Sequence, residues 1–173
     1  MKRQGQDSRF CEPVAIEMKR YFGRDFKRIG HAVEVARYAE QIAKEEGGDP
    51  SIVLLSAFLH DIGIRKAEEK YNSNDARYQE QEGPPVAREI LNRVGVRSEL
   101  IEEVCDIIGH HHHPRKEETL NFKILYDSDL IVNLGSEKSE KGVTEERLRK
   151  VIERKFLTET GRKLAEKIFL NSN

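Results

Sequence analysis

Tryptophan is missing from this 173-residue sequence, and cysteine, proline and long apolar runs are scarce. No apolar run approaches the roughly 18 residues that a membrane-spanning helix needs, so we expect no membrane partner. The two cysteines, Cys11 and Cys105, stand far apart, and we expect buried free thiols rather than a disulfide framework. We find no strand-like alternation, repeat or linker, which argues against a β fold and against several domains.

An excess of charge of one sign is also missing. The chain carries 30 basic and 31 acidic side chains, for a formal net charge of −1. Without a broad basic field we expect no binding of a nucleic-acid duplex, although a local basic patch can hold a small phosphate. The N-terminal segment MKRQGQDSRF has no apolar stretch typical of a secretory signal, so we expect a cytoplasmic protein.

Helical periodicity is what the sequence does contain, with apolar residues at steps of three and four. We therefore predict an all-α fold, a single-domain helical bundle over residues 1–173. The expected helices cover residues 12–22, 26–46, 51–61, 84–95, 98–112, 119–134, 144–156 and 160–170. The polar stretch 63–83 is predicted to be a long loop, and residues 135–142 (GSEKSEKG) an exposed turn or flexible loop.

The first candidates for chemistry follow the most apolar helix. His60 and Asp61 come directly after the run IVLLSAFL. A buried carboxylate is costly unless it is paired or bound to a metal, and a neighbouring histidine suggests shared ligation. His31 shares a helix face with Arg28, three residues earlier, so a guanidinium can lie beside a metal ligand and clamp a phosphate.

Two further groups can contribute ligands. Asp127 and Asp129 interrupt an apolar helix, and a separation of two residues turns them about 200° apart. Only one of them can face a given metal, and periodicity does not choose between them. Residues 110–113 are an internal run of four histidines, of which at most two can face one site. Imidazole together with carboxylate suits iron, manganese, zinc or cobalt.

Five strings of the sequence resemble, in order and spacing, the HD superfamily of metal-dependent phosphohydrolases. They are RIGHAVEVARYAEQIA, LLSAFLHDIG, EGPPVAREIL, DIIGHHHH and ILYDSDLI. The resemblance covers about residues 27–134. The resemblance implies an HD-domain-like core of about five helices that holds one or two metals. We place an N-terminal helix in residues 1–25 and C-terminal helices in residues 143–173.

The resemblance also implies roles for single residues. The common metal-binding set of the family is matched by His31, His60, Asp61 and Asp129. The choice of Asp129 over Asp127 follows from the resemblance, because the second aspartate of the D-x-D string is the usual ligand.

For a second metal, the resemblance points to His111 and His112. Two-metal members carry a further histidine where this sequence has Gly83, and the adjacent Glu82 is the candidate substitute. For the substrate phosphate, Arg28 matches a position that contacts it, and Arg65 and Lys66 are near enough in sequence to assist.

These observations lead to the hypothesis of a metal-dependent hydrolase, a phosphomonoesterase or phosphodiesterase that acts on a small phosphorylated substrate such as a nucleotide. A divalent metal ion (iron, manganese, zinc, cobalt or magnesium) lowers the pKa of bound water from about 16 to about 7. Asp61 and Arg28 are the predicted catalytic residues: Asp61 bridges a second metal or orients the water, and Arg28 neutralises the phosphate. Tyr71 and Tyr78 are the candidates for stacking on a base.

Two other functions remain open at this point. A di-iron oxygenase of the HD fold needs a complete two-iron set, and Gly83 weakens that case. A non-catalytic metal- or nucleotide-binding regulatory module is the second alternative, against which the intact ligand set weighs. The sequence leaves the substrate, the metal and the oligomeric state open.

Overall fold

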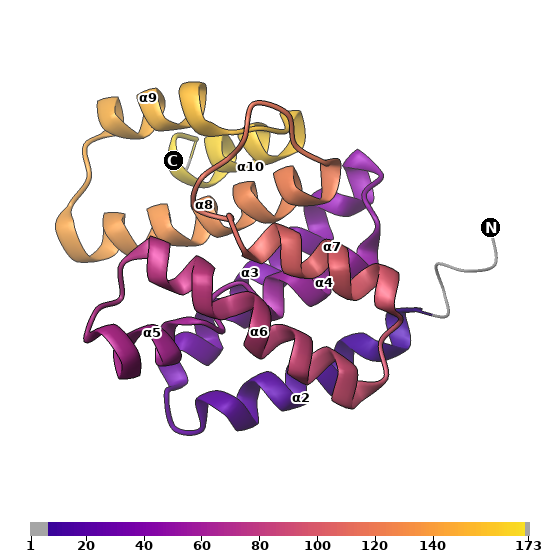
Figure 1. The fold of residues 1–173 in the computed structure, drawn as a ribbon. Coiled ribbons are helices and arrows are strands. Elements are labelled where there is room, and N and C mark those ends of the chain that lie inside the picture. The colour runs from indigo at the N-terminus through magenta and orange to yellow at the C-terminus, as the bar shows by residue number, and fades with distance from the viewer. Residues whose placement is uncertain (1–6, 172–173) are drawn as a thin grey trace.

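The computed structural model describes residues 7–171, which form helices joined by mostly short connections, the longest of them over residues 109–119 (Figure 1). No β-strand occurs in this part of the chain, so the predicted all-α fold is confirmed. No helix within residues 7–171 is both long and apolar enough to cross a membrane. In chain order the elements are η1 (Ser8–Phe10), α2 (Cys11–Phe22), α3 (Phe26–Glu46), α4 (Pro50–Leu59), α5 (Ile64–Tyr71), α6 (Ala76–Val94), α7 (Ser98–Ile108), α8 (Leu120–Lys141), α9 (Glu145–Lys155) and α10 (Glu159–Phe169).

α4 forms the centre of the bundle because it is apolar on nearly every side. Asp49 caps the helix by accepting a hydrogen bond from the backbone N–H of Ser51. The helix packs against α2, α3, α7 and α8. The residues that follow it, His60 and Asp61, are therefore delivered into the interior of the molecule.

α3 and α8 pack against one another as well as against α4. The buried side of α3 includes four alanines, Ala32, Ala36, Ala39 and Ala43, whose small side chains let neighbouring helices approach closely. α10 packs on α3, α8 and α9 and covers the side of the bundle opposite α2 (Figure 1). This arrangement brings the N-terminal part of α3 close to the middle of α8.

The predicted long loop over residues 63–83 is wrong. α5 and the first part of α6 occupy this stretch, and Asn72 separates them by adopting the left-handed conformation that ends α5. α5 is polar in sequence but buries Ile64 and Ala67 and packs on α6. Its stability comes from tertiary packing rather than from a long apolar pattern, which is why the sequence did not reveal it.

The expected helix start at Pro84 and Pro85 is also wrong, since both lie inside α6. Two prolines remove two N–H donors from the helix, so this helix depends on contacts with its neighbours. Cys105 of α7 places its thiol 3.6 Å from the carbonyl oxygen of Pro84. On the other side α6 runs so close to Gly63 that a Cβ there would lie 2.5 Å from the backbone nitrogen of Gly83.

The predicted turn or loop over residues 135–142 is a third error, because α8 continues to Lys141. A single glycine in a helix costs only about 1 kcal/mol. This part of α8 also makes two contacts with the C-terminal helices. Glu137 pairs with Arg147 of α9, and Lys138 donates to the backbone carbonyl of Phe169 in α10.

α7 ends at Ile108, four residues before the predicted end at residue 112. Gly109, a poor helix former, follows it, and the histidine run lies in turns. The four histidines therefore do not follow helical spacing, and their directions could not be predicted from it.

Both cysteines are free thiols, as expected, with Cys105 buried and Cys11 half-buried. Burial raises the pKa of Cys11 to about 11 and also raises the pKa of Cys105. Neither thiol is therefore a nucleophile at neutral pH.

Candidate metal centre

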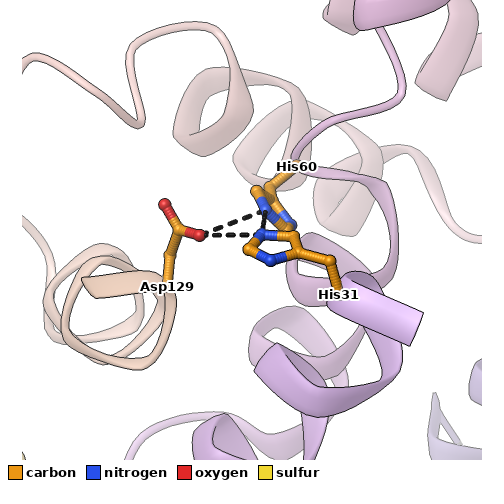
Figure 2. Close-up of side chains that lie close together, drawn as sticks. All are labelled: His31, His60 and Asp129. Atoms are coloured by element: carbon orange, nitrogen blue, oxygen red, sulfur yellow. Dashed lines mark hydrogen bonds and ion pairs between the residues drawn. The ribbon is translucent and has the colours of Figure 1, made fainter. Parts of the chain in front are cut away.

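Three elements that are distant in sequence each deliver side chains to one place. α3 supplies His31 from its second turn, the segment directly after α4 supplies His60 and Asp61, and the middle of α8 supplies Asp129. Figure 2 shows His31, His60 and Asp129 pointing toward one another from these elements. Their convergence follows from the contacts of α3 with α4 and α8.

The ligand atoms of three of these residues are close enough to share one metal ion. His31 Nε2 lies 3.1 Å from His60 Nε2 and 3.0 Å from Asp129 Oδ1, and His60 Nε2 lies 3.5 Å from the same oxygen. Neighbouring ligands around a metal with bonds of about 2.1 Å are separated by about 3.0 to 3.4 Å. The three atoms therefore already have the spacing of a coordination shell.

Asp61 stands between this group and a second one. Its Oδ2 lies 3.6 Å from His31 Nε2 and 3.4 Å from His60 Nε2, while its Oδ1 lies 3.5 Å from His111 Nε2. Asp61, His111 and His112 form a further set of ligand-type atoms within 4.8 Å of one another. One carboxylate thus offers an oxygen to each set.

Two imidazole rings are oriented by backbone carbonyls. His60 Nδ1 donates to the carbonyl of Ala57, and His111 Nδ1 donates to that of Ile108, both at 2.8 Å. Because a carbonyl can only accept, these bonds keep the proton on Nδ1 and leave the lone pair of Nε2 directed at the cluster. His111 Nε2 is buried and has no hydrogen-bond partner within the described residues, which fits a metal ligand.

The two carboxylates of the cluster are held in the ionised form that binds a cation. Burial by itself would raise the pKa of Asp61 and of Asp129, but the neighbouring histidines outweigh it and hold both values below the usual range. Burial likewise disfavours a charged His60, but the two carboxylates outweigh it and raise the pKa of His60. Burial lowers the pKa of His112 to about 4, so this ring is neutral at pH 7.

The cluster opens onto a cleft of about 640 Å³ between α3 and α8. Arg28 lines this cleft one turn before His31 and binds Asp25 Oδ2 at 2.9 Å and Glu68 Oε1 at 2.5 Å. The other residues expected near a substrate phosphate point elsewhere. Arg65 donates to the backbone carbonyl of Tyr21 and pairs with Glu69. Lys66 also pairs with Glu69. Neither Arg65 nor Lys66 lines the cleft.

Several other candidates lie outside the two ligand groups. Asp127 points to the opposite side of α8 from Asp129, where it accepts hydrogen bonds at the start of α10. Glu82 binds Lys70 Nζ at 2.6 Å and Tyr71 OH at 2.9 Å instead of joining the histidines. Tyr71 and Tyr78 stack on each other at 4.1 Å and do not line the cleft.

The outer members of the histidine run have other partners. His110 binds Glu118 and stacks on Phe122 at 4.5 Å, while His113 binds Glu80. Two of the four histidines thus reach the site, the maximum expected for a helical run, although they reach it from turns.

Sequence reasoning missed the other residues of the cleft. Lys27, Glu34, Gln79 and Glu140 all line it. Gln79 lies in the stretch taken for a loop, and Glu140 lies in the stretch taken for a turn. No motif marks Gln79 or Glu140, and only the packing of α6 and α8 places them at the site.

The fold and the site together define an all-α protein with a buried histidine–aspartate centre suited to metal. The sequence matches the HD domain family over residues 28–152, most of its length, and the chain belongs to that family, so the resemblance is confirmed. A crystal structure of a predicted HD superfamily hydrolase from an uncultured Thermotogales bacterium has a TM-score of 0.64 and 26% sequence identity. That similarity covers 89% of this chain and 82% of the other. No curated protein matched the sequence.

Proposed function

We propose that this protein is a metal-dependent phosphohydrolase that acts on a small phosphorylated substrate through metal-activated water. The observation that carries this proposal is the convergence of ligand atoms from four residues, His31, His60, Asp61 and Asp129. All of them except His60 line a cleft that Arg28 also lines. Membership of the HD domain family and the similarity to a predicted hydrolase support it.

A bound divalent metal would supply Lewis acidity, which lowers the pKa of water from about 16 to about 7 and polarises a phosphoryl oxygen. The mixture of imidazole and carboxylate ligands favours iron, manganese, zinc or cobalt over magnesium, which prefers oxygen ligands and retained water. His31, His60, Asp61 and Asp129 would hold this ion.

The protein's own groups position the reactants. Asp61 accepts a hydrogen bond from the attacking water through a carboxylate oxygen and so directs it toward phosphorus. Arg28 binds the phosphate through two parallel N–H donors. Its present partner Glu68 is partly exposed, so an incoming phosphate can displace that carboxylate.

The cleft favours a substrate with one phosphate. Its basic side chains are Arg28 and Lys27, and Lys27 already lies 4.0 Å from Glu140. Glu34 and Glu140 also line the cleft, so a second or third phosphate would meet carboxylates. We propose a phosphomonoester with a neutral, polar organic part, and a nucleoside monophosphate fits this description.

Turnover of a phosphoester panel tests the proposal. The panel contains p-nitrophenyl phosphate, bis-p-nitrophenyl phosphate and nucleoside monophosphates, each with Mn²⁺, Fe²⁺, Co²⁺, Zn²⁺ or Mg²⁺. We expect Asp61→Ala to lower kcat/KM by roughly a thousandfold or more, because it removes a ligand and the group that directs water. Asp106→Ala is the matched control, since Asp106 pairs with Arg115 on the surface. Full activity in Asp61→Ala would sink the proposed mechanism.

A di-iron oxygenase is a second candidate, and the observation in its favour is that Asp61 lies between two ligand groups. The two functions differ in what they consume. An oxygenase would bind two irons and use O₂ in proportion to product, whereas the phosphohydrolase works without O₂ and releases phosphate and an alcohol from a phosphomonoester. An oxygen electrode and a phosphate assay on the same iron-loaded sample distinguish them.

A further inference from the structure

A buried glutamine lies beside the second ligand group. Asp61, His111 and His112 offer ligand-type atoms within 4.8 Å of one another, and His111 Nε2 has no hydrogen-bond partner within the described residues. We infer that the side-chain oxygen of Gln79 is the fourth protein ligand of a second metal site formed with these three residues. The inference rests on the proposed metal centre and is independent of the substrate.

The contacts of Gln79 fix the direction of its amide. Its Nε2 donates to the backbone carbonyl of Asn74, which cannot donate in return. The Oε1 atom therefore faces inward, 3.3 Å from His112 Nε2. Gln79 is only 8% exposed and lines the same cleft as Asp61 and His112. A separation of 3.3 Å is that of two neighbouring ligands around a metal with bonds of about 2.1 Å.

The packing of α6 leaves Gln79 as the residue that reaches this group. Gly83 lies one turn further along α6 on the same face and has no side chain to offer. Glu82 is held by Lys70 and Tyr71. Gly63, two residues after Asp61, lets the backbone of α6 pass at the level of Gln79, because a Cβ on Gly63 would collide with the carbonyl oxygen of Gln79.

The chemistry of an amide ligand predicts how this site differs from the first. An amide oxygen is a neutral, hard ligand. The second site would therefore have only one charged ligand, the carboxylate that it shares with the first site, together with two imidazoles and the amide oxygen. The first site has a carboxylate of its own in Asp129. The second site should therefore bind metal more weakly, and its added oxygen should favour Mn²⁺ relative to Zn²⁺.

Metal titration of the full chain tests the inference. Mn²⁺ binding is measured by calorimetry for the wild type, Gln79→Ala, Gln79→Glu and Gln81→Ala, the last a matched control because Gln81 is exposed on the same helix. We expect two Mn²⁺ per wild-type chain, a second dissociation constant at least about tenfold higher in Gln79→Ala, and an unchanged first one. Gln79→Glu should keep both ions and bind the second more tightly, because it adds a charge.

A spectroscopic measurement separates a ligand from a residue that only supports His112. The visible absorption of Co²⁺ at the second equivalent should change in Gln79→Glu and stay unchanged in Gln81→Ala, and this comparison holds even if Gln79→Ala does not fold. Wild-type affinity for two ions in Gln79→Ala, an unaltered Co²⁺ spectrum in Gln79→Glu, or one ion per wild-type chain at saturation would overturn the inference. Absence of any bound metal would overturn the proposed metal centre as well.

Discussion

Asp127 and Asp129 leave α8 in different directions and meet different partners. Asp129 Oδ1 lies 3.0 Å from His31 Nε2. Asp127 accepts hydrogen bonds from the backbone N–H of Leu157 at 2.8 Å and from the N–H and hydroxyl of Thr158 at 2.7 Å. Burial raises the pKa of Asp127 to about 6, although these hydrogen bonds oppose the shift. One carboxylate faces the proposed metal, and the other anchors the start of α10.

This difference makes a paired prediction. Asp129→Asn should weaken binding of the first metal by roughly a hundredfold or more, because it removes a charged ligand. Asp127→Asn should leave metal binding intact but lower the free energy of unfolding by about 1 to 3 kcal/mol, because the amide NH₂ would face one of the N–H donors. Calorimetric metal titration and chemical denaturation of both variants check it. Equal loss of metal in the two variants would contradict the assignment of Asp129.

At the residue scale, the sequence predicted types of residue better than their directions. His60 and Asp61 stood out because a polar pair followed an apolar run. This pattern is local, so it can be seen without knowing which residues lie near the pair in the fold. The partners of Asp127 lie far along the chain, between α9 and α10, so no local pattern could reveal them. Gln79 was missed for a similar reason, because a buried amide carries no signal in the sequence.

At the scale of the element, the position of α6 depends on the close approach of its backbone to Gly63, and not on a repeat of apolar residues in the sequence. A Cβ on Gly63 would lie 2.5 Å from the backbone nitrogen of Gly83, and this backbone cannot give way as a flexible side chain would. α5 and α6 are therefore positioned by the segment that carries His60 and Asp61. The predicted loop was wrong because α5 buries only Ile64 and Ala67, and two apolar residues in a polar stretch give no clear helical pattern.

Two glycine substitutions test this account. Gly63→Ala should lower the free energy of unfolding by about 1 to 3 kcal/mol, since α6 must shift to accept the methyl group. Gly135→Ala should raise it by about 0.5 to 1 kcal/mol, because Gly135 lies within α8 and a Cβ there would meet nothing within 4 Å. Denaturant unfolding of both variants provides the measurement. Destabilisation by Gly135→Ala would argue that α8 ends before this residue.

At the scale of the whole molecule, the formal charge of −1 hides an uneven distribution around the cleft. Arg28 and Lys27 lie among Glu34, Glu140 and the acidic ligands. The overall prediction of an all-α bundle could be made from periodicity, because each helix carries its own apolar face. The cleft could not be predicted from periodicity, because residues of α3, α6 and α8 line it and come together only when these helices pack.

The charge of the cleft predicts substrate selectivity. With one nucleoside, kcat/KM should be at least about tenfold higher for the monophosphate than for the triphosphate, because added phosphates approach carboxylates. Glu140→Gln should narrow this ratio, since it removes a negative charge and frees Lys27. Glu137→Gln on the same helix is the control, because Glu137 pairs with Arg147 away from the cleft. A triphosphate preference in the wild type would contradict this view of the substrate.

Activity of the metal-free protein, measured while metal is returned, tests the proposed metal centre most directly. The full chain is stripped with a chelator and assayed on p-nitrophenyl phosphate and nucleoside monophosphates during titration with Mn²⁺, alongside His31→Ala. We predict that the stripped protein is inactive, that turnover rises as Mn²⁺ binds, and that His31→Ala neither binds the first ion nor recovers activity. Equal turnover with and without bound metal, or full recovery in His31→Ala, would contradict the proposed role of this site.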